Sequence, residues 1–242
     1  MEKLQEENKY YILYSPDTLK YINDNIDKVL IPKIEEYKKI FKLENFKQIQ
    51  INYFDDIEKF RNYIYKIRGE NKSLPTYAAG TYDLDMINVY IDIKSNDYET
   101  KKIYIANHEL FHILYKKNIL NDDMSKRIVW YDEGMAQYLS GEKDYLLNEE
   151  EFKEYYNTIK NSTNQIPNLN NLKHGKTFKN EDYNAYDLSY LSIRYLKEIL
   201  NDKEFFSLMS DFNKILEYGN NITKDMFDYY DNILNKKGIK RI

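Results

Sequence analysis

The chain has 242 residues, of which 42% are hydrophobic and 31% are charged, and its formal net charge at pH 7 is −4. This length suits one large domain or two small ones, and it buries enough surface to fold without disulfides or a structural metal. The composition excludes a disordered chain, and no apolar run in the sequence has the length of a membrane span. The negative charge argues against a nucleic-acid-binding protein, which needs a basic face. We therefore expect neither a membrane nor a nucleic acid as a partner.

Cysteine, glycine and proline are scarce. The chain has no cysteine, which excludes a disulfide framework, a thiol nucleophile and a cysteine-based zinc site. Its 7 glycines and 4 prolines supply too few tight turns for an all-β fold and favour long helices. The first residues lack the apolar stretch of a signal peptide, so as written the chain is expected to be cytoplasmic. A secreted chain whose signal has been removed and which restarts at Met1 has the same appearance, so localisation stays open.

The first ninety or so residues mix strands with two helices. Alternating apolar positions predict strands at Lys9–Tyr14, Gln48–Phe54, Thr76–Tyr82 and Met86–Ile93. A long helix is expected to begin at Ser15-Pro16-Asp17, where serine can cap and proline suits the first turn, and to run to about Phe41. Pro32 can kink or split this helix. Helical spacing returns over Asp55–Ile67.

Helices dominate the rest of the chain. They are expected at about 99–117, 129–140, 149–160, 184–200, 202–217 and 223–236. Asn161–Asn180, which is rich in asparagine, is the best candidate for a long loop. Strands first and helices later indicate an α+β fold rather than alternating α/β. Because no linker is visible, we expect one domain over residues 1–242, with an α/β upper half (1–120) and a helical lower half (121–242).

His108-Glu109-Leu110-Phe111-His112 matches the motif H-E-x-x-H inside a predicted helix. Residues four apart lie one above the other on a helix, so both imidazoles can reach one metal ion. Glu109 lies about 100° round the helix from His108 and can approach a water molecule on that metal without being a ligand. The alternative is that two core histidines lie one turn apart by chance. We favour the metal site, because this helix is apolar nearly all round and unpartnered polar side chains inside it are costly.

A catalytic zinc usually takes three protein ligands and keeps a fourth position for water. Glu133 is the best third ligand, because it lies in a second apolar helix, Trp130–Tyr138, after enough chain for a turn and an antiparallel return. Gly134 and Ala136 are small and let two helices approach closely. His174 is also available, but in the asparagine-rich loop a solvated surface residue is expected. Glu133 can alternatively be surface charge or a partner of the helix dipole.

The segments HELFH and WYDEGMAQYLS resemble the gluzincin metallopeptidases, which include thermolysin, the aminopeptidase N family and the peptidase-MA-like domains of bacteria. The resemblance covers about residues 75–200. It implies a zincin-like fold and one Zn²⁺ per chain, with Glu133 as the third ligand beside His108 and His112. In these families that glutamate often stands in W-x-x-E-G.

A tyrosine of the aminopeptidase N family also has a counterpart here. That family carries Y-x-x-G before an apolar helix, and its tyrosine stabilises the oxyanion. The chain has Tyr186-Asp187-Leu188-Ser189, with serine in place of glycine, and the resemblance therefore implicates Tyr186. Tyr190, one turn along the same helix, is the reserve candidate. In a chain with 26 tyrosines, the alternative is that Tyr186 only packs.

Two departures from the gluzincin pattern matter. The fourth position after the glutamate ligand is often acidic, whereas here it is Gln137. An amide can still accept from an imidazole N–H, but it raises ligand basicity less than a carboxylate does, so weaker zinc binding is expected. The segment Tyr77–Met86 lacks the G-x-M-E-N sequence with which aminopeptidases bind a free α-amine, so endopeptidase action is favoured.

We expect a zinc-dependent metallopeptidase in which Glu109 is the general base and the substrate is a peptide or protein. Met86–Ile93 is either an edge strand that pairs with extended substrate or an ordinary sheet strand. The rival classes are a zincin-fold binding module and a hydrolase of non-peptide bonds. Glu109 weighs against the binding module, which has no chemical use for it. Subsite specificity and oligomeric state are not written in any local motif.

Overall fold

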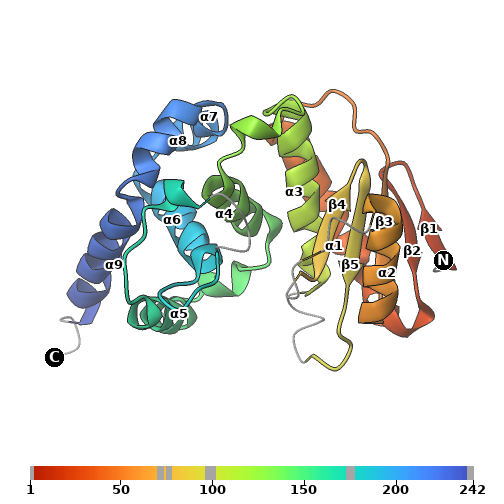
Figure 1. Cartoon of the computed structure of the whole chain (residues 1–242), viewed down its shortest axis with the longest axis horizontal. Helices are drawn as coiled ribbons and strands as arrows, with labels where there is room; N and C mark the ends of the chain where they lie inside the picture. The colour runs from red at the N-terminus through yellow and green to blue at the C-terminus, as the bar shows by residue number, and fades with distance from the viewer. Residues whose placement is uncertain (1–2, 70–73, 75–77, 96–101, 173–177, 239–242) are drawn as a thin grey trace. The chain divides into compact units, whose positions relative to one another are not determined.

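A computed structural model describes residues 3–69, 74, 78–95, 102–172 and 178–238 (Figure 1). The chain forms two compact units, Met1–Asn118 with Leu139–Glu142, and Ile119–Tyr138 with Lys143–Ile242. The helix α4 (Val129–Ser140) contributes residues to both of them. No helix in the described part of the chain is both long enough and apolar enough to span a bilayer.

The first unit is built on a five-stranded mixed sheet in the order β1-β2-β3-β5-β4. Its strands are β1 (Lys3–Glu7), β2 (Tyr11–Ser15), β3 (Ile49–Phe54), β4 (Gly80–Asp83) and β5 (Met86–Tyr90). The central strands β2, β3 and β5 run parallel, whereas β1 and β4 pair antiparallel with their neighbours. Of the two alternatives for Met86–Ile93, the ordinary sheet strand is the correct one, because β5 pairs with β3 on one side and with β4 on the other.

Three helices accompany the sheet in this unit: α1 (Lys20–Ile40), α2 (Ile57–Arg68) and α3 (Ile105–Asn118). The apolar stripe of α1 is fully buried, and the helix continues through Pro32 rather than dividing there. Asp56 caps α2 by accepting hydrogen bonds from the amides of Glu58 and Lys59. Phe60 and Ile64 of α2 then pack on the sheet around Phe54.

The second unit is helical. It contains most of α4 together with α5 (Glu149–Ser162), α6 (Ala185–Ile199), α7 (Asp202–Ser207), α8 (Phe212–Gly219) and α9 (Ile222–Gly238). The single helix predicted over 202–217 is divided by a 3₁₀ turn, Leu208–Ser210, after which Asp211 caps α8. The predicted α+β class, with an N-terminal mixed sheet and a mainly helical remainder, is confirmed for the described residues.

Helices α4 and α6 approach closely at Gly134. A Cβ built on Gly134 would lie 2.6 Å from the carbonyl oxygen of Ser189 and 2.7 Å from Cγ1 of Ile193. The small residue was expected to allow close approach to the H-E-x-x-H helix, whereas the helix that packs against Gly134 is α6. The residue next to it, Glu133, is consequently held on a helix whose packing leaves little freedom to turn.

Candidate metal centre

The helix α3 carries the H-E-x-x-H motif through the interior of the first unit. From Glu109 to Tyr115 every side chain is buried, and the ring of Phe111 stacks on that of Tyr115 with centroids 5.6 Å apart. His112 is 4% exposed, and the side chain of His108 is 14% exposed. The expectation of a helix that is buried nearly all round is therefore confirmed. Such an environment excludes bulk water from most of the motif and strengthens electrostatic interactions within it.

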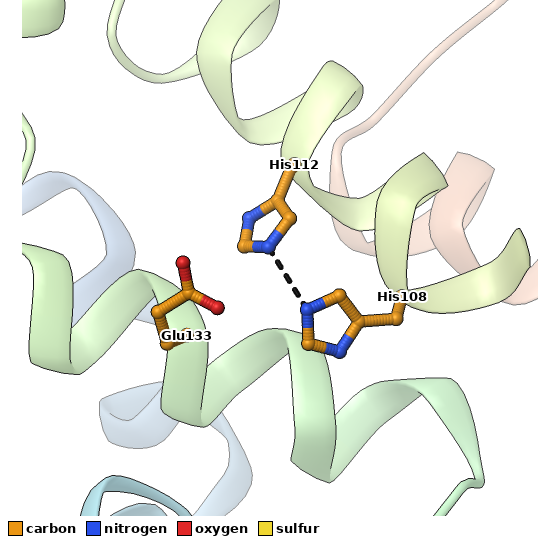
Figure 2. A group of neighbouring side chains, drawn as sticks. All are labelled: His108, His112 and Glu133. Atoms are coloured by element: carbon orange, nitrogen blue, oxygen red, sulfur yellow. Dashed lines mark hydrogen bonds between the residues drawn. The ribbon is translucent and has the colours of Figure 1, made fainter. Parts of the chain in front are cut away.

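The two histidines point their Nε2 atoms toward each other. Nε2 of His108 lies 3.0 Å from Nε2 of His112 (Figure 2). Two nitrogen ligands on one tetrahedral zinc, each at about 2.0–2.1 Å, are about 3.3–3.4 Å apart. The one-turn spacing thus brings the two nitrogens close to the separation that a shared zinc ion requires.

Glu109 lies against the last strand of the sheet. It is 8% exposed, and its carboxylate contacts β4 at Gly80. The same strand places Tyr82 beside His112, with ring centroids 5.7 Å apart. Strand β4 therefore runs along the side of α3 that presents the motif.

Glu133 is fixed by an arginine of its own unit. Nη2 of Arg127 donates to Oε1 of Glu133 at 2.7 Å, and Nε of Arg127 donates to Asp132. The side chain of Glu133 is only 13% exposed, which does not suit the alternative of a solvated surface charge. Arg127 engages one carboxylate oxygen by this bond, and a carboxylate has further lone pairs with which to bind a metal.

His108 and His112 each offer one ring nitrogen in the first unit, and Glu133 offers a carboxylate in the second (Figure 2). Two imidazoles and one carboxylate are a donor set found in catalytic zinc sites with three protein ligands. The residues present therefore fit a zinc ion, and their assignment as its ligands stays a prediction. His174, the alternative ligand, lies outside the described residues.

The two candidate tyrosines have different surroundings in α6. Tyr186, in the first turn, is partly buried, and its ring packs edge-on against Phe178 with centroids 4.8 Å apart. Tyr190 is only 4% exposed and lies among the rings of Tyr138 and Tyr155. Burial raises the pKa of Tyr190 to about 12. Tyr186 is therefore the more accessible of the two, and its assignment as oxyanion donor stays a prediction.

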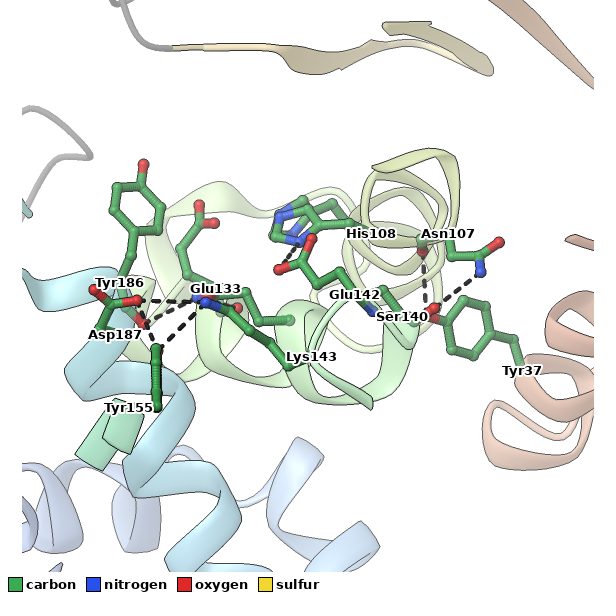
Figure 3. A network of polar contacts seen from close by, with 12 residues as sticks. Tyr37, Asn107, His108, Glu133, Ser140, Glu142, Lys143, Tyr155, Tyr186 and Asp187 are labelled. Atoms are coloured by element: carbon green, nitrogen blue, oxygen red, sulfur yellow. Dashed lines mark hydrogen bonds and ion pairs between the residues drawn. The ribbon is translucent and has the colours of Figure 1, made fainter. Parts of the chain in front are cut away.

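Sequence reasoning did not anticipate the polar network that holds the start of α6 (Figure 3). Asp187 accepts hydrogen bonds from Tyr155 Oη at 2.7 Å and from Asn184 Nδ2 at 2.6 Å, and Lys143 Nζ lies 3.5 Å from it. Burial, together with the Asp187 charge, raises the pKa of Tyr155 far above its usual value, so this hydroxyl remains a donor. The network fixes the helical turn that also carries Tyr186.

The amide nitrogen of Gln137 contacts backbone carbonyls of α4 and α6. Its side-chain amide donates to the carbonyl oxygen of Tyr186 at 3.0 Å, and more weakly to that of Glu133 at 3.4 Å. The residue thereby ties α4 to the first turn of α6.

An H-E-x-x-H motif on a buried helix, with the imidazoles turned toward each other, defines a metallopeptidase type of centre. The chain belongs to the collagenase family, peptidase M9, which matches residues 31–232. The prediction of a zinc metallopeptidase is thus confirmed at the level of the family. The match also begins well before residue 75, in a region that carries no diagnostic motif. None of the curated proteins compared with the chain matches it.

Proposed function

We propose that the chain is a zinc-dependent endopeptidase of the gluzincin type, in which His108, His112 and Glu133 hold one Zn²⁺. The observation that carries the proposal is the pair of Nε2 atoms 3.0 Å apart on a buried helix of a chain from a peptidase family. Glu109, the residue after the first histidine, ligates nothing in this scheme and is reserved for proton transfer. Bound zinc lowers the pKa of a water molecule toward 7 and polarises the scissile carbonyl.

The protein side chains supply the remaining steps. Glu109 accepts a proton from the attacking water and passes it to the leaving amine, so that the peptide bond breaks without releasing a free amide anion. Tyr186 donates a hydrogen bond to the developing oxyanion, a contribution of roughly 3 kcal/mol judged from comparable donors. Glu109 is buried, so its carboxylate is shielded from bulk solvent and can act on one bound water molecule.

Strand β4 is the element that we propose aligns the substrate. It is the last strand of the described sheet beyond β5, and it lies beside both Glu109 and His112. An extended peptide can add to such an edge through main-chain hydrogen bonds, which do not depend on side-chain identity. This mode suits cleavage within a polypeptide, and it agrees with the missing amine-binding sequence of the aminopeptidases.

Cleavage of an unbiased library of peptides with acetylated N-termini tests the proposal. Zinc-loaded parental protein is expected to cut internal bonds, and Glu109→Gln is expected to keep its zinc while losing about 10²–10⁴ in rate. Near-parental cleavage by Glu109→Gln would contradict the assigned mechanism. Binding without cleavage would indicate a binding module, and cleavage confined to non-peptide bonds would indicate another class of hydrolase.

A further inference from the structure

We propose that Glu142 is a positioning residue that orients His108 for the metal, an inference that rests on the proposed zinc function. Oε1 of Glu142 lies 3.5 Å from Nδ1 of His108 (Figure 3). Both residues belong to the first unit, and both side chains are largely shielded, with exposed fractions of 19% for Glu142 and 14% for His108. This separation is that of a close polar contact, slightly longer than an ordinary hydrogen bond.

The two nitrogens of the His108 ring point to different partners. Nε2 faces His112, so it is the nitrogen that is turned toward the metal site, and Nδ1 faces Glu142. A ligating imidazole binds metal through an unprotonated nitrogen and carries its proton on the other one. A carboxylate at Nδ1 therefore selects the tautomer that leaves the Nε2 lone pair available, and it raises the basicity of that nitrogen.

The backbone explains how Glu142 reaches α3. The chain leaves α4 at Gly141, whose φ of +90° lies in the region that favours glycine. The amide of Glu142 then donates to Oγ of Ser140 at 3.3 Å. A residue with a Cβ at position 141 would resist this turn, so the glycine is what allows the next side chain to fold back.

A second contact fixes the same end of α4 to α3. Asn107, the residue before His108, donates from Nδ2 to the carbonyl oxygen of Ser140 at 2.9 Å. The carbonyl oxygen of Asn107 in turn accepts a hydrogen bond from Tyr37 of α1 at 3.2 Å, inside the core. Two contacts therefore hold Glu142 near α3. The backbone two residues before it, at Ser140, is bound by Asn107, and its own carboxylate lies beside His108.

Glu142 can take the role of the carboxylate that Gln137 replaces. The expected carboxylate, four positions after Glu133, is an amide here, and that amide donates to Tyr186. Glu142 lies nine positions after Glu133, beyond the end of the helix, and supplies a carboxylate to a ligand by another route. Zinc affinity need not be weakened by the glutamine if Glu142 has this role.

Zinc affinity measured by competition with a chromophoric chelator tests the inference without an activity assay. Glu142→Ala is expected to weaken zinc binding about 10–100-fold, the usual cost of losing such a partner. Glu142→Gln keeps an oxygen acceptor but loses charge assistance, so a smaller loss, about 3–10-fold, is expected. Glu154→Gln, which removes one carboxylate from an exposed site on α5, is the matched control and should bind zinc as the parent does.

Two further measurements separate positioning from general stability. Thermal unfolding of the metal-free proteins should show Glu142→Gln close to the parent, and the visible spectrum of the Co²⁺-loaded protein should change in Glu142→Ala but not in Glu154→Gln. Parental zinc affinity in both Glu142 variants would overturn the inference, as would a loss of metal-free stability with unchanged affinity. Failure of the parental protein itself to bind zinc would instead overturn the proposed function.

Discussion

The carboxylate of Glu109 lies directly over Gly80: a Cβ built on this glycine would be 2.6 Å from Oε1 of Glu109 and 2.6 Å from Cγ2 of Ile105. Separations under about 3 Å between such carbon and oxygen atoms are repulsive, so no larger residue fits without movement. Strand β4 and helix α3 thus approach so closely that a side chain at position 80 would displace the carboxylate of Glu109, the proposed general base.

Gly80→Ala is therefore expected to damage catalysis more than stability. Oε1 of Glu109 is the end of a long side chain and can shift, whereas Cγ2 of Ile105 lies close to the backbone of a stiff β-branched residue, so the free energy of unfolding should fall by about 1 kcal/mol, the low end for overpacking. The shift moves the Glu109 carboxylate, and a displacement of about 1 Å can cost on the order of 10² in rate. Peptidase assays, urea unfolding and metal analysis check this together. Parental turnover, or a lower rate that follows zinc loss, would contradict it.

Gly134→Ala is expected to have the larger effect in unfolding experiments. Its Cβ would meet the backbone carbonyl of Ser189 at 2.6 Å, and a helix backbone cannot move aside as a side-chain end can. Overpacking of this kind costs about 1–3 kcal/mol, which exceeds the roughly 1 kcal/mol that alanine gains over glycine in helix propensity. The midpoint of urea unfolding should fall further for Gly134→Ala than for Gly80→Ala. An unchanged midpoint would show that α6 tolerates the extra methyl group.

Local sequence patterns were sufficient for most of the helices and for the existence of most strands. The range 129–140 predicts α4 to the residue, because caps and apolar spacing act within a few residues. The order of the sheet was not accessible in the same way. That β5 lies inside the sheet depends on its pairing with β3, more than thirty residues earlier, and an alternating pattern does not name its neighbour. Strand β1, which is short and mostly polar, was missed.

In the candidate site, too, local relations could be predicted from the sequence and long-range contacts could not. His108, Glu109 and His112 share one helix, and their relation follows from helical periodicity alone. The partners that orient the site come from other elements: Arg127 lies on a 3₁₀ turn boundary before α4, and Glu142 follows a glycine with positive φ after it. No local sequence spacing predicts the contact of Arg127 with Glu133 or that of Glu142 with His108, because both depend on how the chain folds.

The predicted ligands, His108, His112 and Glu133, determine how much zinc the protein and its variants should contain. Purified protein should contain about one zinc per chain, and His112→Ala and Glu133→Ala should each release most of it, because two ligands hold an open catalytic site poorly. His174→Ala should retain the metal. Elemental analysis after gel filtration in metal-free buffer gives the measurement. Retention of a full equivalent by His112→Ala, or loss of zinc from His174→Ala in place of Glu133→Ala, would replace the proposed site by another.

The two tyrosines of α6 give the final prediction. If Tyr186 donates to the oxyanion, then Tyr186→Phe should keep zinc and lower kcat by about 10²–10³, the cost of removing one such donor. KM should change little, because this hydrogen bond strengthens in the transition state rather than in the bound substrate. Tyr190→Phe is the matched control on the same helix, since its hydroxyl lies among buried rings and its pKa is raised to about 12 by that burial.

The control also decides between the alternatives. A hydroxyl that only helps Tyr186 pack against Phe178 can be removed at little cost, because the ring itself makes that contact. Tyr186→Phe would then show parental kcat. Loss of turnover in Tyr190→Phe, with Tyr186→Phe unaffected, would move the oxyanion role one turn along α6 and would require Tyr190 to leave its buried position when substrate binds. A fall in kcat confined to Tyr186→Phe, with zinc and the unfolding midpoint unchanged, is the result that the partly exposed place of Tyr186 in the first turn of α6 leads us to expect.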